Sequence, residues 1–388
     1  IMDKLISFAL PLMLSGILQL MFNAVDIVVV GRFSGSQALA AVGSTTALIN
    51  VFTNLFIGIS LGANVLAARY YAAGKTKEMS ETVHTAIALA LVSGVAMAVI
   101  GVVFARGALE IMGTPDDVIA KSTLYMRIYF CGMPFFMMYN YGAAILRAVG
   151  DTKRPLIFLI VSGVINAVLN LFLVIGFHLD VAGVGIATVI SQLVSCILVL
   201  RCLHHTESSY QLHLAKLRIR SVYLKQIFEV GVPAGIQSTV INISNAMLQS
   251  SVNSFGSIAM AGYTASNNIF GFLYVSVNSF TQACMSFTSQ NYGVKKLKRM
   301  DRVLIDCMIL SVVVTLILGS SVYIFGPELL HIYSNQADVI KYGMEIFSYT
   351  TVTYFLCGLM DLFPGALRGM GYSTVPMICT RDCSKCSK

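Results

Sequence analysis

Charged side chains are scarce in this chain. Only 11% of its 388 residues are charged, 56% are hydrophobic, and the mean hydropathy is +0.78. A water-soluble domain carries about 25% charged residues, and this sequence has too few to cover a water-facing surface. The composition therefore excludes a soluble globular protein and predicts that most of the chain lies in a lipid bilayer.

Motifs for catalysis and cofactor binding are also missing. The sequence has no Walker A motif, so ATP does not power transport within this chain. Its six histidines are scattered over loops and helix ends, without the spacing of metal ligands. Near the end, Cys379, Cys383 and Cys386 form at most half of a zinc pattern, and we expect an unstructured tail there. We predict that the protein is not an enzyme and holds no cofactor or metal.

Long apolar runs dominate the sequence instead. About 20 residues span a bilayer as a helix, and a helix pairs its own backbone groups, as lipid requires. The runs lack the alternation of barrel strands, so we predict an all-α membrane protein. Ten spans are expected, at about 5–30, 44–68, 83–105, 122–146, 156–177, 182–203, 226–250, 266–289, 303–325 and 342–366.

The basic residues indicate how these spans are oriented. All but five of the 26 Lys and Arg residues fall on one side of the membrane if the first residues are cytoplasmic. Cytoplasmic loops carry an excess of Lys and Arg, so we predict a multi-pass protein with both termini in the cytoplasm. The net charge of +8 then reflects topology, and we expect no nucleic-acid partner.

The chain repeats itself at an offset of 221 residues. Short motifs recur at this distance, with Leu146-Arg147, Gly150 and Pro155 matching Leu367-Arg368, Gly371 and Pro376. An even number of spans precedes the second copy, which predicts parallel repeats related by an axis along the membrane normal. Duplicated membrane bundles of this kind bracket a central cavity, and the repeat therefore indicates a transporter.

The repeat also divides the chain into predicted domains. A polar, basic segment at 204–225 separates an N-terminal lobe of six helices at 1–203 from a C-terminal lobe at 226–388. The second copy has room for four helices, because its last two spans should recur at about 377–424. We therefore expect twelve helices in a full-length protein and an incomplete second lobe in this chain.

Polar side chains in the first lobe lie at helical spacing around one acid. Gln19, Asn23 and Asp26 share a face of the first helix. A charged group costs about 2.5–3.5 kcal/mol at the centre of a bilayer, so such an acid faces a cavity or a partner. Asp26 alternatively reaches the outer headgroups. Further candidates for one polar chamber are Asn50, Asn54, Tyr139, Asn140, Asn166, Asn170, Thr188 and Gln192. These side chains alternatively serve as contacts between membrane helices.

The second lobe is chemically different. A leucine takes the place of Asp26, and the seventh helix instead carries amides on one face. The candidates for lining a cavity there are Asn242, Asn245, Gln249, Gln282 and Asp361. Asp361 alternatively forms an ion pair with Arg368, seven residues later.

In the first lobe, Pro11 frees a backbone carbonyl and permits a kink, so it is a candidate hinge that would move Asp26.

Several of these motifs together resemble one family of transporters. The chain is similar to the multidrug and toxic compound extrusion (MATE) transporters, in particular their DinF-like bacterial branch. The resemblance covers essentially all of residues 3–378. It is carried by the first helix from Pro11 to Asp26 and by the segments 68–74, 146–151, 289–293 and 367–371.

The resemblance implies two lobes arranged as a V and a location in the cytoplasmic (inner) membrane of a bacterium. It implies an antiporter that exports organic, often cationic drugs or metabolites against protons or sodium. The family's cation site falls here on Asp26, Asn166, Asn170 and Thr188. Asn170 stands where the family has an Asp, which leaves one carboxylate, and the choice between proton and sodium stays open.

We therefore expect a cation-coupled antiporter that acts as a monomer on a small-molecule substrate. The sequence leaves two alternatives open. One is a lipid-linked oligosaccharide flippase of the same superfamily, which would need a cavity rich in Arg and Lys. The other is a truncated remnant that does not transport.

Overall fold

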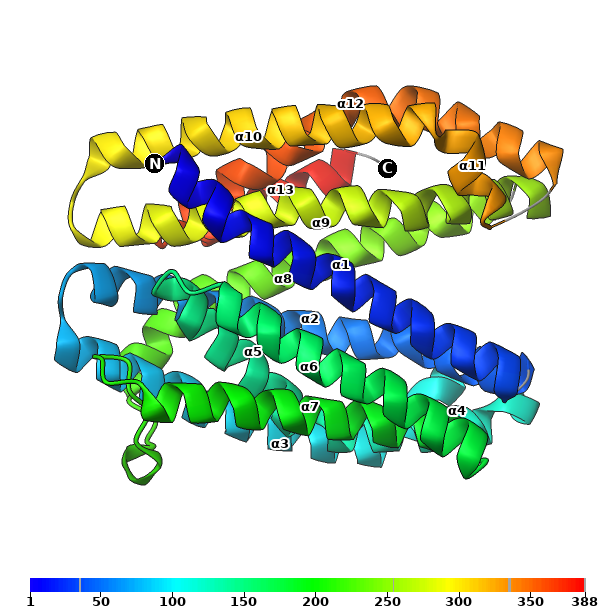
Figure 1. The fold of residues 1–388 in the computed structure, drawn as a ribbon, viewed down its shortest axis with the longest axis horizontal. Helices are drawn as coiled ribbons and strands as arrows, with labels where there is room; N and C mark the ends of the chain where they lie inside the picture. Colours follow the sequence, from blue (N-terminus) through cyan, green and yellow to red (C-terminus); the bar gives the residue numbers. More distant parts are fainter. Residues whose placement is uncertain (35, 254, 334–335, 387–388) are drawn as a thin grey trace. The chain divides into compact units, whose positions relative to one another are not determined.

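The computed structural model describes residues 1–34, 36–253, 255–333 and 336–386, and it is helical almost throughout (Figure 1). The helices, in chain order, are α1 (Met2–Phe33), α2 (Ser36–Ala72), α3 (Thr76–Ile111), α4 (Asp116–Cys131), α5 (Met133–Ala148), α6 (Lys153–Asn170), the π-helix Leu171–Gly176, α7 (Asp180–His205), the 3₁₀ turn Leu214–Lys216, α8 (Ser221–Asn253), α9 (Ser257–Gly293), α10 (Leu297–Ile324), α11 (Gly326–His331), α12 (Ala337–Met370) and α13 (Thr374–Cys386).

The long helices have the length and composition of membrane spans. Within the described residues, seven helices are long and apolar enough to cross a bilayer, and they are in α1, α2, α3, α6 with its π-helix, α7, α10 and α12. Their outer faces carry large apolar side chains, as on α3, where Val103 and Phe104 are 63% and 64% exposed. Such surfaces are stable only against lipid, and they confirm the predicted all-α membrane fold.

The predicted duplication is visible in the helix boundaries. Helices α2 and α9 each have 37 residues, and α9 begins 221 residues after α2. Helices α3 and α10 begin at the same spacing, as do α6 and α13. Gly150 and Gly371 both adopt φ of +96° where α5 and α12 end. This left-handed conformation favours glycine, so the same residue ends the corresponding helix in both copies.

Two sequence predictions about helices are wrong in detail. The expected single span at 122–146 is two helices, α4 and α5, which are separated at Gly132. Pro134, near the start of α5, has no N–H and its ring excludes the carbonyl of the preceding turn, so it sits at a helix start. The corresponding positions of the second copy lie within the continuous helix α12, which has no proline there.

The expected unstructured tail is also wrong, because Thr374–Cys386 forms α13. Helix α13 begins after the Gly371 turn at the position that corresponds to the start of α6. Its Thr380 hydroxyl accepts a 2.8 Å hydrogen bond from Gln237 Nε2 and donates at 3.0 Å to the Pro376 carbonyl. This contact to α8 joins the helix to the rest of its unit.

The chain forms two compact units, and two helices are divided between them. One unit contains residues 1–13 and 237–388, and the other contains residues 14–236. The boundary in α1 follows two residues after Pro11, and the boundary in α8 follows three residues after Pro233. The prediction from sequence instead separated 1–203 from 226–388 at the linker.

Each unit has its own apolar core. In the unit of residues 14–236, one large cluster includes Tyr141, Phe130, Met133 and Ile145, all fully buried. In the other unit, Leu5 and Phe8 of α1 pack with Phe280 of α9 and Leu362 of α12. The start of α1 thus supplies core side chains to the unit that contains the second copy.

Candidate functional site

The polar site of residues 14–236 is built around Asp26 of α1 and two asparagines of α6. Asn170 Nδ2 donates a hydrogen bond to Asp26 Oδ1. The same Nδ2 donates at 3.2 Å to Asn166 Oδ1, one turn earlier on α6. The structure therefore brings together three of the four residues expected to bind the coupling cation. Asp26 and Asn170 lie 144 residues apart in the sequence.

The site is largely withdrawn from the surface. Asn170 is fully buried and Asn166 is 6% exposed, while Asp26 is half-buried. Asn170 Oδ1 is buried without a hydrogen-bond partner. A buried amide oxygen that makes no hydrogen bond loses about 1–3 kcal/mol, so this atom is available to a proton donor or a cation.

Close packing of α1 and α6 holds these groups together. Gly163 of α6 faces the ring of Phe22 of α1, and a Cβ added at Gly163 would lie 1.9 Å from that ring. The missing side chain therefore lets α1 approach α6 one turn away from Asp26. Directly after Asn170 the α-helix changes to the π-helix Leu171–Gly176, an irregularity that is frequent at functional sites.

Two tyrosines of α4 belong to the surroundings of the site, and the sequence reasoning missed them. Tyr125 and Tyr129 lie within electrostatic range of the Asp26 carboxylate. Their rings are neighbours, with centroids 6.1 Å apart. Tyr125 and Tyr129 lie one helical turn apart in a predicted span, and this pattern could have identified them as polar groups on one face.

In the described part of the chain, none of the hydrogen bonds of the remaining first-lobe candidates goes to Asp26, Asn166 or Asn170. Thr188 donates its hydroxyl to the Val184 carbonyl of its own helix at 2.9 Å. Tyr139 donates to the Pro155 carbonyl, and Asn140 donates to the Phe136 carbonyl. Gln192 is half-buried and its side chain hydrogen-bonds with Tyr129 of α4, while its Oε1 has no partner. The side chains of Gln19, Asn23 and Asn50 are exposed, and that of Asn54 is half-buried.

The unit of residues 1–13 and 237–388 has a polar cluster of a different kind. Asp361 is half-buried, and in the described residues it forms no ion pair within 4 Å. Arg368 instead donates from Nη2 to Gln237 Oε1 at 2.6 Å, and the charges of Asp361 and Arg368 interact without a direct contact. Gln282 donates to Asn278 at 2.9 Å. Three further candidates lie on α8, with Asn242 and Asn245 exposed and Gln249 half-buried.

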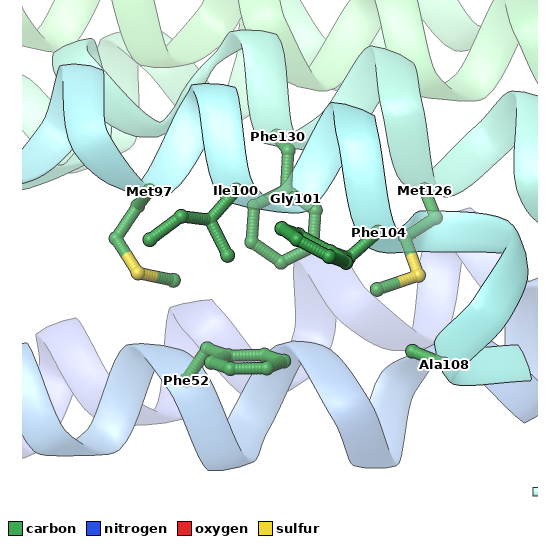
Figure 2. A pocket seen from close by; sticks show the side chains of 8 residues that line it. All are labelled: Phe52, Met97, Ile100, Gly101, Phe104, Ala108, Met126 and Phe130. Carbon is green, nitrogen blue, oxygen red and sulfur yellow. The ribbon is translucent and has the colours of Figure 1, made fainter. Parts of the chain in front are cut away.

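A separate cavity between α2, α3 and α4 is apolar and small. Its volume is about 20 Å³, and it is lined by Phe52, Met97, Ile100, Gly101, Phe104, Ala108, Met126 and Phe130 (Figure 2). A space of this size holds at most one water, which would need polar partners to stay. Every side chain around it is apolar, so this cavity is not the polar chamber.

The geometry of the helices and of the polar site defines a class of protein. A duplicated bundle of apolar helices holds a half-buried carboxylate against buried amides in one copy, and ionisable groups inside membrane bundles mark ion or substrate pathways. Such a protein is a membrane transporter built from two repeats. The sequence profile of the MatE family matches residues 11–172 and 233–384, and the chain belongs to this family.

Relatives and solved structures agree with this assignment. The chain is 29% identical to the "Probable multidrug resistance protein YoeA" of Bacillus subtilis (strain 168), over 96% of this chain and 82% of that protein. It is 21% identical to the "Multidrug export protein MepA" of Staphylococcus aureus (strain MSSA476), over 96% of this chain and 82% of that protein. Its fold matches the outward-facing structure of a multidrug resistance MATE family transporter with a TM-score of 0.92 and 20% identity, over 98% of this chain and 85% of that one.

Proposed function

We propose that this MatE-family transporter is an antiporter that exports organic, often cationic compounds from the cytoplasm in exchange for protons or sodium ions. The observation that carries the proposal is the group of Asp26, Asn170 and Asn166, with its unpartnered buried oxygen. Relatives named for multidrug resistance and multidrug export support the substrate class.

The group can hold either coupling ion. A proton on Asp26 would convert the carboxylate into a hydrogen-bond donor. Asn170 could accept that hydrogen bond at Oδ1 after its side-chain amide flips. A sodium ion would instead be bound by oxygens of Asp26, Asn166 and Asn170, because hard cations take oxygen ligands. Either ion neutralises a carboxylate that is costly to expose to lipid. Ion binding and release therefore change how α1 is held against α6.

Pro11 supports a way for this change to move the helix. It lies within α1 just before the residue at which the helix passes from one compact unit to the other. Proline removes one helical hydrogen bond and permits a bend. We propose that Pro11 is the hinge through which the state of Asp26 alters α1. Two solved MATE structures, each 20% identical to this chain, are of a bent conformation and a straight conformation.

A flippase for lipid-linked oligosaccharides is not favoured by the contacts of Arg127, a cation within a predicted span. Arg127 of α4 is exposed and donates from Nε to the Val102 carbonyl of α3 at 3.2 Å. That contact binds the guanidinium to a neighbouring helix, whereas a pyrophosphate ligand requires free cationic groups in the cavity.

The test is Asp26→Asn in the full chain, reconstituted into liposomes. Efflux of a cationic dye is measured with an imposed proton gradient and, separately, with an imposed sodium gradient. We expect the variant to lose at least tenfold in ion-driven efflux, because a missing charge interaction of about 1.4 kcal/mol or more is a factor of ten. Asp117→Asn is the matched control, since Asp117 is exposed near the start of α4, and it should transport normally. Unchanged efflux by Asp26→Asn would refute the role of this carboxylate.

A further inference from the structure

A basic groove lies between the beginning of α3 and the segment that joins the two repeats. Its volume is about 520 Å³. The residues that line it are Lys77, Ser80, Glu81, Ala215, Lys216, Leu217 and Arg218. All of them belong to the unit of residues 14–236. The groove is far from the Asp26 group in sequence and shares no residue with it.

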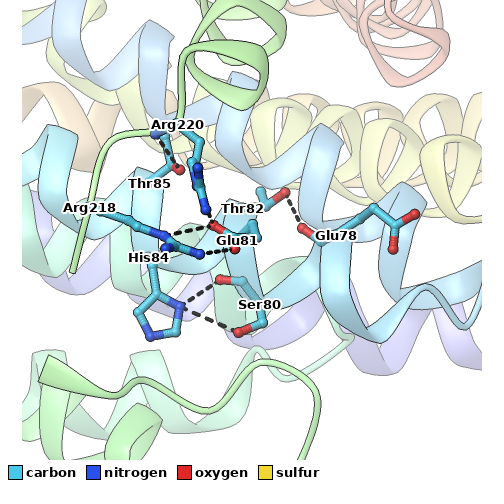
Figure 3. A network of polar contacts seen from close by, with 8 residues as sticks. All are labelled: Glu78, Ser80, Glu81, Thr82, His84, Thr85, Arg218 and Arg220. Atoms are coloured by element: carbon cyan, nitrogen blue, oxygen red, sulfur yellow. Dashed lines mark hydrogen bonds and ion pairs between the residues drawn. The ribbon is translucent and has the colours of Figure 1, made fainter. Parts of the chain in front are cut away.

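The linker is held on α3 by a polar network with one acid at its centre (Figure 3). Glu81 accepts hydrogen bonds from the guanidinium groups of both Arg218 and Arg220, at 3.3 Å from each Nε. The Arg220 backbone N–H donates to the Thr85 hydroxyl, also at 3.3 Å. These contacts position the linker so that its basic side chains line the groove next to α3.

The network leaves the groove with an excess of positive charge. Two arginines share the single carboxylate of Glu81. Lys77 and Lys216 form no ion pair with any residue that the structure describes. Among the residues that line the groove, two lysines and Arg218 thus stand against one acid, Glu81. An anion with several oxygens would complete this set, because guanidinium and ammonium groups bind phosphate strongly.

The groove lies at the level of phospholipid headgroups. The apolar run of α3 begins at about residue 83, so Lys77 precedes the hydrocarbon region by roughly 9 Å at 1.5 Å per residue. The linker beside the groove exposes three large apolar side chains, Leu214, Ile219 and Val222, which are 58%, 42% and 62% exposed. A segment outside the spans that alternates exposed apolar and basic residues is typical of the membrane surface.

We propose that this groove binds the headgroup of an anionic phospholipid and fixes the linker between the repeats to the membrane surface. The ammonium groups of Lys77 and Lys216 bind the phosphate, and Leu214, Ile219 and Val222 contact the acyl boundary. A free phosphate would satisfy the cations and leave the apolar side chains in water. The combination of both features therefore selects a lipid as the occupant.

The test uses the full chain in detergent and titrates it with phosphatidylglycerol, while native mass spectrometry counts bound lipid. Lys77→Gln combined with Lys216→Gln should weaken the tightest binding roughly thirtyfold, from about 1 kcal/mol for each basic residue near an anionic surface. Lys298 is the repeat equivalent of Lys77 at the start of α10. The matched control, Lys296→Gln with Lys298→Gln, removes the same charge there and should bind phosphatidylglycerol like the parent chain.

Phosphatidylcholine and inorganic phosphate distinguish the possible occupants. Phosphatidylcholine should bind much more weakly than phosphatidylglycerol, because it carries no net charge. Inorganic phosphate at matched concentration should not displace the lipid. The proposal is wrong if both lysine pairs weaken binding equally, if the two lipids bind equally well, or if inorganic phosphate competes with the lipid through Lys77 and Lys216.

Discussion

At the scale of single residues, the proposed ion site contains side chains whose polar atoms have only some of their possible hydrogen-bond partners. Asn170 donates from its amide NH2 group to two oxygens and leaves its own oxygen unpartnered. A fully paired amide would hold Asp26 in one state, since a satisfied buried network is rigid. The unpartnered acceptor oxygen beside a carboxylate is therefore the feature that suits an exchangeable ion.

A second residue-scale feature is a histidine pair at the start of α3. His84 donates from Nδ1 to the Ser80 carbonyl at 2.7 Å, and its Nε2 accepts the backbone N–H of His213 at 3.1 Å. One donor and one acceptor nitrogen describe a neutral imidazole. The two rings stack with centroids 6.2 Å apart. Burial, Lys216, His84 and His204 all lower the pKa of His213 from its ordinary value.

This pair predicts that the linker loosens in acid. A histidine with a lowered pKa binds fewer protons in the folded state than in the unfolded state. Its contribution to the stability of the folded linker is therefore fully present above the ordinary pKa of about 6.5 and is lost as the pH falls below that value. We expect hydrogen exchange at the His213 amide, corrected for intrinsic rates, to accelerate several-fold between neutral pH and pH of about 5.

His213→Gln is the variant that isolates titration at His213. Glutamine keeps the backbone N–H that donates to His84 Nε2 and does not titrate, so its linker should exchange with little pH dependence. If the parent chain and His213→Gln respond equally to acid, titration of His213 is not the cause.

At the scale of helices, glycines decide which elements approach each other. Gly58 and Gly62 of α2 face Gly231 and Gly235 of α8, and a Cβ added at Gly58 would lie 2.3 Å from the Gly235 Cα. Both pairs have the spacing G-x-x-x-G, through which membrane helices pack backbone against backbone. The first half of α8 is thereby joined to α2 within the unit of residues 14–236.

Gly58→Ala should therefore destabilise the protein by about 1–3 kcal/mol, because two backbones must separate to admit a methyl group. Gly43, on the same helix, has no heavy atom within 4 Å of the corresponding position. Gly43→Ala should be neutral or stabilise by up to about 1 kcal/mol, since alanine favours helix over glycine. Thermal unfolding midpoints in detergent compare the two variants. Equal midpoints would mean that the contact between α2 and α8 is dispensable.

At the scale of the whole molecule, the duplication produces two units that are alike in their helices and unlike in their chemistry. Helices α2 and α9 match in length and position, yet the polar group around Asp26 has no carboxylate counterpart in α8. The second unit instead holds Asp361 and the Arg368–Gln237 hydrogen bond. Similar backbones thus carry an anionic site in one unit and, in the other, a site with both an acidic and a basic side chain.

The distribution of basic residues predicts the orientation of the whole protein. In a variant without native cysteines, single cysteines at His178 and Ile258 should react with an impermeant maleimide added from outside intact cells. Cysteines at Lys216 and Lys296 should react only after the cells are opened. All four side chains are exposed, so accessibility depends on the side of the membrane. Labelling of the two lysine positions from outside would reverse the predicted orientation.

The sequence by itself determined what depends on local pattern. Runs of apolar residues specify helices in lipid, since each helix pairs its own backbone groups whatever its neighbours are. The repeat spacing predicted the corresponding starts of α2 and α9, and the polar face of α1 identified Asp26. The sequence did not reveal the break at Gly132, because a proline inside an apolar run is compatible with a kink as well as with a new helix.

Only the tertiary structure decided which of these helices meet and which polar atoms pair. Asp26 and Asn170 lie 144 residues apart and His84 and His213 lie 129 residues apart, and no local pattern links them. The division of α1 after Pro11 and of α8 after Pro233 was likewise absent from the sequence prediction. Helix formation depends on neighbours along the chain, whereas the choice of partner depends on shape and on the depth at which each polar group is buried.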